Sequence, residues 1–264
     1  MMFLFSLFNL CLALPAVPST TIEKHLKAFN QSAHFSLPTL SAAQIAKLQN
    51  GDVVTILDSS QGVDAPSRAV GMMLSEVPKK QLWLSCQDPH AVLQSSTKEL
   101  KTKTNSDKSA HWYGFFDLPW PFSDRHWMVK SWNVTSVATT SNNQYWEHPW
   151  DLLPNGATDI LPFIEAGKLP GVTLDLVDDA VYTPVSKGAW IVMDIQSDLR
   201  LVVYHATTVV GGSIPADAVV RYTVTTLSDM LKGMEKRAIE WVPTHYVSGH
   251  AGVLGGDNNE VPLY

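Results

Sequence analysis

The stretch that decides the fold is GGSIPADAVVRYTVTTLSDMLKGMEKRAIEW, residues 211–241. After its glycines and proline, apolar side chains recur at alternating spacings of four and three residues, which is the repeat of one helix face. The spacing therefore predicts a long helix with one continuous apolar stripe, and such a stripe must pack on a neighbouring element. Its members are Val220, Val224, Leu227, Leu231, Met234, Ala238 and Trp241.

The partner of this helix is predicted to be a sheet, because most of the upstream chain has the pattern of strands. Runs rich in Thr, Trp and Val are separated by Asn, Ser, Asp and Gly. The order of short helices, antiparallel strands and one long helix gives an α+β class, with a curved antiparallel sheet against the helix. Strands are expected at about 52–57, 68–77, 98–104, 110–117, 125–137, 143–148, 180–185, 187–195 and 199–209, and short helices at 21–29, 41–48 and 78–83.

One segment interrupts the rhythm of strands. Residues 151–175 contain Pro154, Pro162, Pro170 and several glycines, which break regular structure. We expect a long loop or an insertion of short helices here, and ordered insertions of this length are often functional.

Composition limits the classes of function. The chain has 264 residues, of which 45% are hydrophobic and 17% are charged, so it can bury one large core or two small ones. Its formal net charge of −6, without a block of Lys and Arg, argues against nucleic acid as a partner.

The first sixteen residues predict export. Met1 to Ala16 contain no charged side chain, and an apolar run is followed by Pro15 and Ala16, as in a secretory signal. We expect a secreted or periplasmic protein, with a cytoplasmic one as the alternative. Without this segment Cys86 is the only cysteine, so an intrachain disulfide is excluded.

Two motifs carry a resemblance to a known family. Residues 120–129, WPFSDRHWMV, resemble the segment that opens a strand in START (StAR-related lipid transfer) domains, and GGSIP at 211–215 looks like the segment that starts their C-terminal helix. Residues 77–83, VPKKQLW, resemble an early helix of the wider Bet v 1 and polyketide cyclase superfamily. In this chain His126 occupies the position of the family's acidic residue after the Arg, and the insertion has no counterpart.

The resemblance implies a helix-grip fold that holds one lipid or other hydrophobic molecule between sheet and helix. We expect a monomeric carrier that meets a membrane surface transiently and needs no cofactor. The domain limits are then a signal peptide at 1–16, an N-terminal helical segment at 17–47, a START-like domain at 48–242 and a C-terminal tail at 243–264.

The candidate binding residues follow from strand alternation. Arg125, Trp127 and Val129 share one face of their strand, and Lys130 on the other face prefers solvent, so we expect the Arg125 face to look inward. A buried Arg125 either anchors a polar ligand head or forms an internal salt bridge, and both interpretations remain open. Tryptophans on the strands either line a pocket or fill a core. The predicted ligand-binding residues are Arg125, Trp127, Val129, Trp190, Tyr204, Val224, Leu227 and Leu231.

Two other functions are compatible with the same fold. In an enzyme of the cyclase or aromatase type, His126 or His205 would act as acid or base with Arg125 as oxyanion partner. In an interaction module, side chains would fill the pocket. The sequence contains no HExxH or GxSxG motif, so we expect neither a metal site nor a serine nucleophile.

Overall fold

The computed structural model describes residues 15–59, 66–87, 97–214 and 216–264, and for residues 216–220 the backbone alone. The expected signal segment, Met1 to Ala16, lies almost wholly outside these ranges, so export stays a prediction. No helix within these ranges is both long enough and apolar enough to span a membrane.

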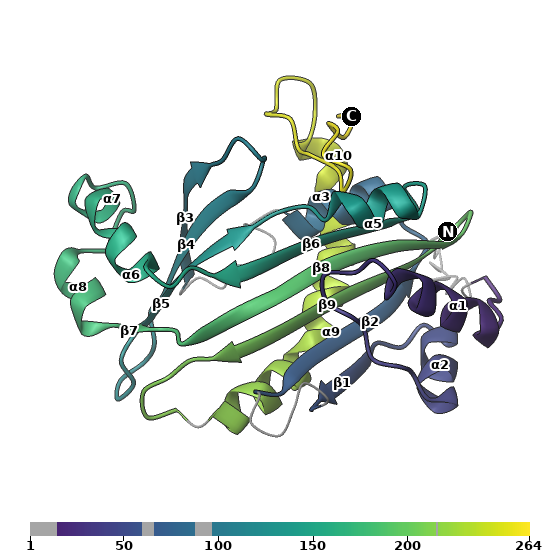
Figure 1. Cartoon of the computed structure of the whole chain (residues 1–264), viewed down its shortest axis with the longest axis horizontal. Helices are drawn as coiled ribbons and strands as arrows, with labels where there is room; N and C mark the ends of the chain where they lie inside the picture. Colours follow the sequence, from purple (N-terminus) through teal and green to yellow (C-terminus); the bar gives the residue numbers. More distant parts are fainter. Residues whose placement is uncertain (1–14, 60–65, 88–96, 215) are drawn as a thin grey trace, which may run out of the picture.

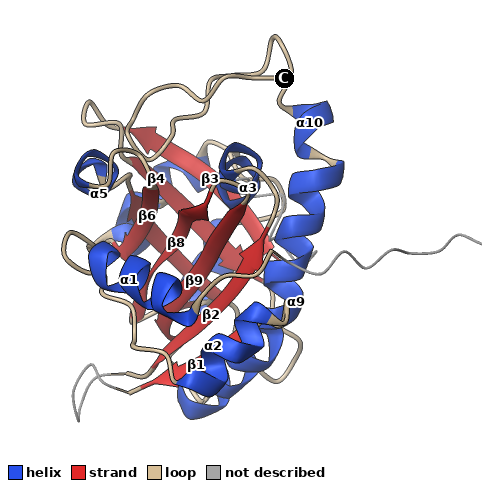
Figure 2. Cartoon of the chain, turned by 90° about the vertical axis from the view of Figure 1, so that its right-hand side faces the viewer, coloured by secondary structure: helices blue, strands red, loops and turns tan. Residues whose placement is uncertain are grey.

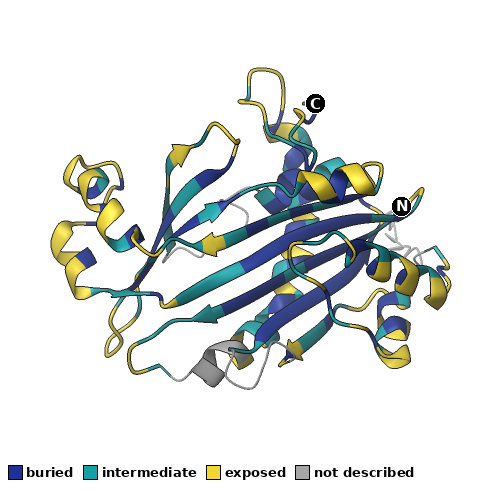
Figure 3. Cartoon of the chain, viewed as in Figure 1, coloured by how far each residue is buried: buried dark blue, intermediate teal, exposed yellow. Residues whose placement is uncertain are grey.

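The described strands form one curved, almost entirely antiparallel sheet (Figure 1). Its order is β1-β2-β9-β8-β6-β5-β4-β3, and the short β7 pairs in parallel with β5. The long central strands β8, β9 and β2 are the most buried (Figure 3). The bounds are β1 Val54–Asp58, β2 Arg68–Ser75, β3 Thr97–Thr104, β4 Ala110–Phe116, β5 Arg125–Ser131, β6 Tyr145–Leu152, β7 Val181–Tyr182, β8 Val185–Gln196 and β9 Leu199–Val209.

The long C-terminal helix α9, Ala216–Glu240, lies across one face of this sheet, as predicted. It packs chiefly on β1, β2 and β9, with α3 (Lys79–Gln87) and α10 (Val242–His245) beside it (Figure 2). We call this side, which carries Gly71, Trp190 and Tyr204, the helix face of the sheet. The α+β class and the sheet wrapped around a C-terminal helix are confirmed. Buried members of the predicted stripe are Leu227, Leu231, Met234 and Ala238.

The opposite side of the sheet, which we call the outer face, is covered by the N-terminal helices (Figure 1). Helices α1, Ser19–Phe29, and α2, Ala42–Gln49, bury Ile22, Phe29 and Leu48 against it. Helix α2 begins with a capping box, in which Ser41 and Gln44 each bond the other's backbone.

The insertion between β6 and β8 consists of short helices, which confirms one of the two expectations for it. Helices α6 (Gly156–Asp159), α7 (Leu161–Glu165) and α8 (Leu174–Asp179) lie at the end of the sheet formed by β4, β5 and β7 (Figure 1). They cover the outer face there. The apolar cluster that joins them to the sheet contains Tyr113, Phe115, Met128, Ile160, Ile164, Leu169, Val172 and Val177.

The strand expected over 125–137 ends earlier than its composition suggests. β5 stops at Ser131, and residues Thr135–Thr140 form the short helix α5. Tertiary contacts override the β propensity here. The side-chain nitrogen of Asn133 donates to the carbonyl of Gly255 and to Oδ1 of Asn258, and its side-chain oxygen contacts Nδ1 of His148. These contacts turn the chain away from the strand pairing of β5.

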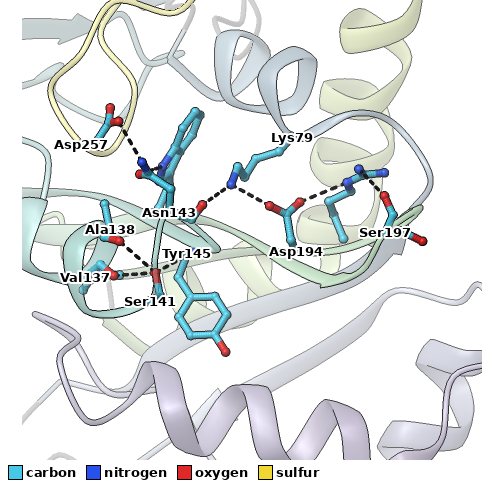
Figure 4. Close-up of polar contacts among 11 residues, drawn as sticks. Lys79, Val137, Ala138, Ser141, Asn143, Tyr145, Asp194, Ser197 and Asp257 are labelled. Carbon is cyan, nitrogen blue, oxygen red and sulfur yellow. Dashed lines mark hydrogen bonds and ion pairs between the residues drawn. The ribbon is translucent and has the colours of Figure 1, made fainter.

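A polar network joins α3 to the central sheet (Figure 4). Asp194 accepts from Lys79 Nζ at 2.6 Å and from Arg200 Nε at 3.2 Å. Lys79 also donates to the carbonyl of Asn143, whose side-chain amide donates to Asp257 at 3.1 Å. The network therefore links α3, the turn before β6 and the C-terminal segment.

Residues 243–264 pack onto the body of the protein. Tyr246 and Val261 are buried in the cluster that contains α3 and α9. The indole nitrogen of Trp83 donates to the carbonyl of Leu254 at 2.9 Å, and Gly256 lies directly against the Trp146 ring. The C-terminal segment thus shares the core beneath α3.

Candidate ligand-binding site

The register of the sheet decides which predicted site residues share a face. Tyr204 lies opposite Trp190 on one side and opposite Gly71 on the other, and Gly71 touches α9. Ser131 lies opposite Trp150, whose ring lies over Gly188 of β8, and Gly188 is two residues before Trp190. Directly opposed residues point to the same side. The face that carries Arg125, Trp127 and Val129 is therefore the helix face, and all eight predicted residues lie on it or on α9.

The members on α9 pack tightly against the sheet. Leu227 and Leu231 are 1% and 0% exposed. Leu231 Cδ1 lies 2.9 Å from the position that a Cβ on Gly71 would occupy, so the glycine allows the helix to approach. At this point helix and sheet are in direct contact. A role of these leucines as ligand contacts stays a prediction.

Beside α9 the helix face carries half-buried aromatic side chains, which we call the aromatic strip: Trp112, Trp127, Trp150 and Tyr204. The ring centroids of Trp150 and Tyr204 are 5.6 Å apart, and those of Trp190 and Tyr204 are 4.6 Å apart. Gly114 lets the Trp127 indole lie flat on β4, because a Cβ there would sit 2.3 Å from the ring.

Arg125 is held by main-chain carbonyls. It is 3% exposed, and its Nη1 donates to Ser123 and Asp124 while its Nη2 donates to Gly211 at 2.9 Å. The Asp124 carboxylate accepts instead from the Leu118 amide. Within the described residues no carboxylate forms an ion pair with Arg125, and its Nε is buried without a partner.

This arrangement gives Arg125 a position that neither sequence interpretation contained. Its guanidinium joins the start of β5 to the two glycines that precede α9, and burial lowers its pKa. Gly212, with a φ of +64°, leaves room for it, since a Cβ there would lie 2.8 Å from Nη2. The internal salt bridge is not formed with any described residue, and the role as ligand anchor stays a prediction.

Further polar groups of the helix face were not predicted as site residues. Glu99 on β3 lies opposite Gly114, beside Trp127, and burial raises its pKa to about 7. The Ser131 hydroxyl is buried without a partner among the described residues. Alternation along the strand places Ser131 on the face of Arg125, whereas the position of Glu99 depends on the pairing of β3 with β4.

The residues of the enzyme alternative are not brought together. His126 and His205 lie on the outer face and are 2% and 1% exposed. The ring of Phe35, from the N-terminal segment, covers His205 with centroids 5.3 Å apart. Arg125 lies on the other side of the sheet, so the expected pairing of either histidine with this arginine is wrong. Across the described residues, no group of three or more His, Cys, Asp and Glu side chains could hold a metal ion.

Two buried groups of the outer face affect stability with opposite dependence on pH. Burial lowers the pKa of His205 from 6.5 to about 3, and it raises that of Glu147 from 4.5 to about 7 although the amides of His34 and Phe35 donate to it. Stability due to His205 is complete above pH 6.5 and is lost as the pH falls toward 3. Stability due to Glu147 is complete below pH 4.5 and is lost as the pH rises through 7.

We expect Glu147→Gln to make the protein more sensitive to acid. In the folded wild type Glu147 binds a proton as the pH falls from about 6.5 to about 5, and this stabilises the fold against the loss due to His205. The variant lacks this contribution. Since one proton bound over one pH unit contributes about 1.4 kcal/mol, the variant should lose about 2 kcal/mol more stability than the wild type over this interval. Urea unfolding at the two pH values measures this difference. The exposed Glu165→Gln is the control and should behave like the wild type. A common pH dependence in all three proteins would mean that Glu147 does not take up a proton in this interval.

Comparisons with known proteins support the fold. No family model and no curated protein matches the chain. Among solved structures, human STARD10 aligns with a TM-score of 0.54 and 14% identity over 86% of this chain and 82% of that one. The lipid transfer and protein localization domain of human StarD13 aligns with a TM-score of 0.50 and 8% identity over 77% and 100%. A STAR-related lipid transfer protein from Xanthomonas axonopodis aligns with a TM-score of 0.49 and 18% identity over 70% of this chain and 98% of that one. The two structures with TM-scores of 0.54 and 0.50 show that the chain has the fold of START domains.

Proposed function

We propose that the chain binds one apolar molecule, such as a lipid, on the helix face beside α9 and carries it without covalent chemistry. The observation that supports this most is the aromatic strip. Its large rings are only half-buried and can contact a ligand, whereas Leu227 and Leu231 of α9 are completely buried against the sheet. Hiding about 400 Å² of ligand surface would contribute about 10 kcal/mol before the cost of ordering. Such a carrier needs shape and few polar contacts.

Polar anchors are available at both ends of the strip. Arg125 Nε and Ser131 Oγ are buried without partners among the described residues. The two residues lie on the same face of β5, with their Cα atoms about 20 Å apart at about 3.3 Å per residue. We propose that a ligand head bonds one of them, because an unpaired buried donor costs free energy that a ligand acceptor would recover.

Membrane contact is proposed for the loop between β4 and β5. Trp120 is 92% exposed and Phe122 is 44% exposed, an unusual position for large apolar side chains. Arg125 at the end of this loop bonds Gly211, so the loop is linked to the segment where α9 begins. Aromatic side chains favour the membrane–water interface.

Native mass spectrometry with extraction of bound lipid tests this function. We expect about one apolar molecule per chain in the purified wild type. Trp127→Ala should lower the occupancy severalfold, because it removes a ring of the aromatic strip. Trp120→Ala is the matched control: it should keep the equilibrium occupancy and slow uptake from phosphatidylcholine vesicles.

Two results would oppose the proposal. A purified protein without bound lipid that also takes up none from vesicles would favour the interaction module with a filled pocket. Equal occupancy in the wild type and Trp127→Ala would move the ligand away from the aromatic strip.

A further inference from the structure

A second candidate site lies on the outer face, on the opposite side of the sheet from α9. Helices α6, α7 and α8 line an open groove of about 520 Å³ together with β5 and β7. Since it shares no residue with the aromatic strip, it is independent of the function proposed above. The groove is lined by His126, Ala157, Leu161, Leu174, Asp175, Val177, Asp178, Ala180 and Tyr182.

His126 supplies a polar group at the floor of the groove. The side chain is 2% exposed, and its Nδ1 lies 3.2 Å from the Tyr113 hydroxyl. Tyr113 is 0% exposed, and its hydroxyl contacts no other described group. The hydroxyl therefore donates to Nδ1, because its proton would otherwise be buried and unpaired. This places the imidazole proton on Nε2.

The Nε2 proton of His126 is available to a ligand. Nε2 bonds no described residue, and it is not among the side-chain atoms that are sealed from solvent. Burial lowers the pKa of His126 to about 4, so the ring is neutral at neutral pH. The neighbouring Tyr182 presents only its ring, 5.0 Å from the imidazole, because its hydroxyl is bound to the carbonyl of Leu153 at 2.6 Å.

The walls and mouth of the groove have a different chemistry from its floor. Leu161 and Leu174 are 38% and 43% exposed and give the groove apolar walls. Asp175 and Asp178, three residues apart on α8 and therefore on one side of it, are exposed at the rim. The residues that line the groove include no Lys or Arg, so these charges favour a cation.

We propose that this groove binds an organic cation that carries an apolar group and a hydrogen-bond acceptor. The ammonium group lies near Asp175 and Asp178, the apolar group lies between Leu161 and Val177, and the acceptor receives the Nε2 proton of His126. The volume is in the range of small-molecule sites, which is about 300 to 1,000 Å³.

Benzoylcholine is a suitable probe, because it combines an aromatic ring, an ester carbonyl and a quaternary ammonium that does not titrate. Its neutral isostere 3,3-dimethylbutyl benzoate has nearly the same shape without the charge. Binding is followed by NMR of the histidine ring nitrogens in the full-length protein, with affinity from titration. We expect benzoylcholine to shift the His126 signals and leave those of His205 unchanged, and the isostere to bind about tenfold more weakly.

Matched charge variants locate the site. Asp175→Asn with Asp178→Asn should weaken benzoylcholine binding about fivefold to tenfold, since two partly exposed ion pairs are lost. Asp198→Asn with Asp229→Asn removes the same net charge from exposed positions elsewhere and should leave the affinity unchanged. All four positions are exposed, so the fold is retained.

Three outcomes would overturn the proposal. The first is that millimolar benzoylcholine leaves the His126 signals unchanged. The second is that benzoylcholine and its neutral isostere bind with equal affinity. The third is that the two double variants bind benzoylcholine with equal affinity. This test uses neither lipid occupancy nor the Trp127→Ala variant. The groove proposal can therefore fail while the carrier function holds, and the carrier function can fail while the groove proposal holds.

Discussion

Gly188→Ala should be among the most destabilising single substitutions in this protein. A Cβ at this position would lie 2.2 Å from the main-chain oxygen of His205 and 2.6 Å from the Trp150 ring. The main-chain oxygen belongs to the central pair of β8 and β9 and cannot move aside without disturbing that ladder. We expect a loss of about 3 kcal/mol in the free energy of unfolding, which corresponds to a fall of about 10 °C in Tm.

The matched control is Gly233→Ala in α9. No atom lies within 4 Å of the position of its Cβ, so the methyl group meets open space. Alanine is favoured over glycine in a helix interior, and we expect a gain of about 0.5 to 1 kcal/mol. Thermal and urea unfolding of both variants measure the contrast. If both variants matched the wild type, the close packing of β8 and β9 would not be present in solution.

The second large effect concerns the contact between Gly71 and Leu231. We expect Leu231→Ala to cost about 3 kcal/mol, because a completely buried leucine is removed and leaves a cavity. Gly71→Ala alone should also destabilise, by about 1 to 3 kcal/mol, since its Cβ would lie 2.9 Å from Leu231 Cδ1 and 3.3 Å from Leu227 Cβ.

The double variant tests whether the helix seals this part of the sheet. The methyl group of the new alanine at position 71 enters the space vacated by Leu231, so the combined loss should be about 1 to 2 kcal/mol smaller than the sum. Strict additivity would falsify direct packing of α9 on β2. It would mean that the two residues do not touch and that α9 stands away from the sheet.

The helices and strands were largely predictable because their signals are local. The stripe from Leu227 to Ala238 marks α9, the capping box at Ser41 marks the start of α2, and the proline-rich segment marks the insertion. The end of β5 could not be predicted from local sequence, because Asn133 turns the chain through contacts with Gly255 and Asn258, more than a hundred residues away.

The candidate site was predictable only in part. Alternation correctly placed Arg125, Trp127 and Val129 on one face, since it depends on strand geometry alone. It could not assign partners. The carbonyl of Gly211 that holds Arg125, and the pairing that sets Glu99 beside Trp127, depend on segments brought together by folding.

The sequence by itself determined the α+β class, the long amphipathic helix and the face of the sheet that the helix covers. These features follow from the spacing of apolar and polar side chains within single helices and strands, which is local in the sequence. Only the tertiary structure decided that α9 packs directly on Gly71, that the aromatic strip lies beside it, and that His126 opens into a separate groove under the insertion. These features depend on strand register and on close approach between distant segments, which no local pattern of side chains encodes.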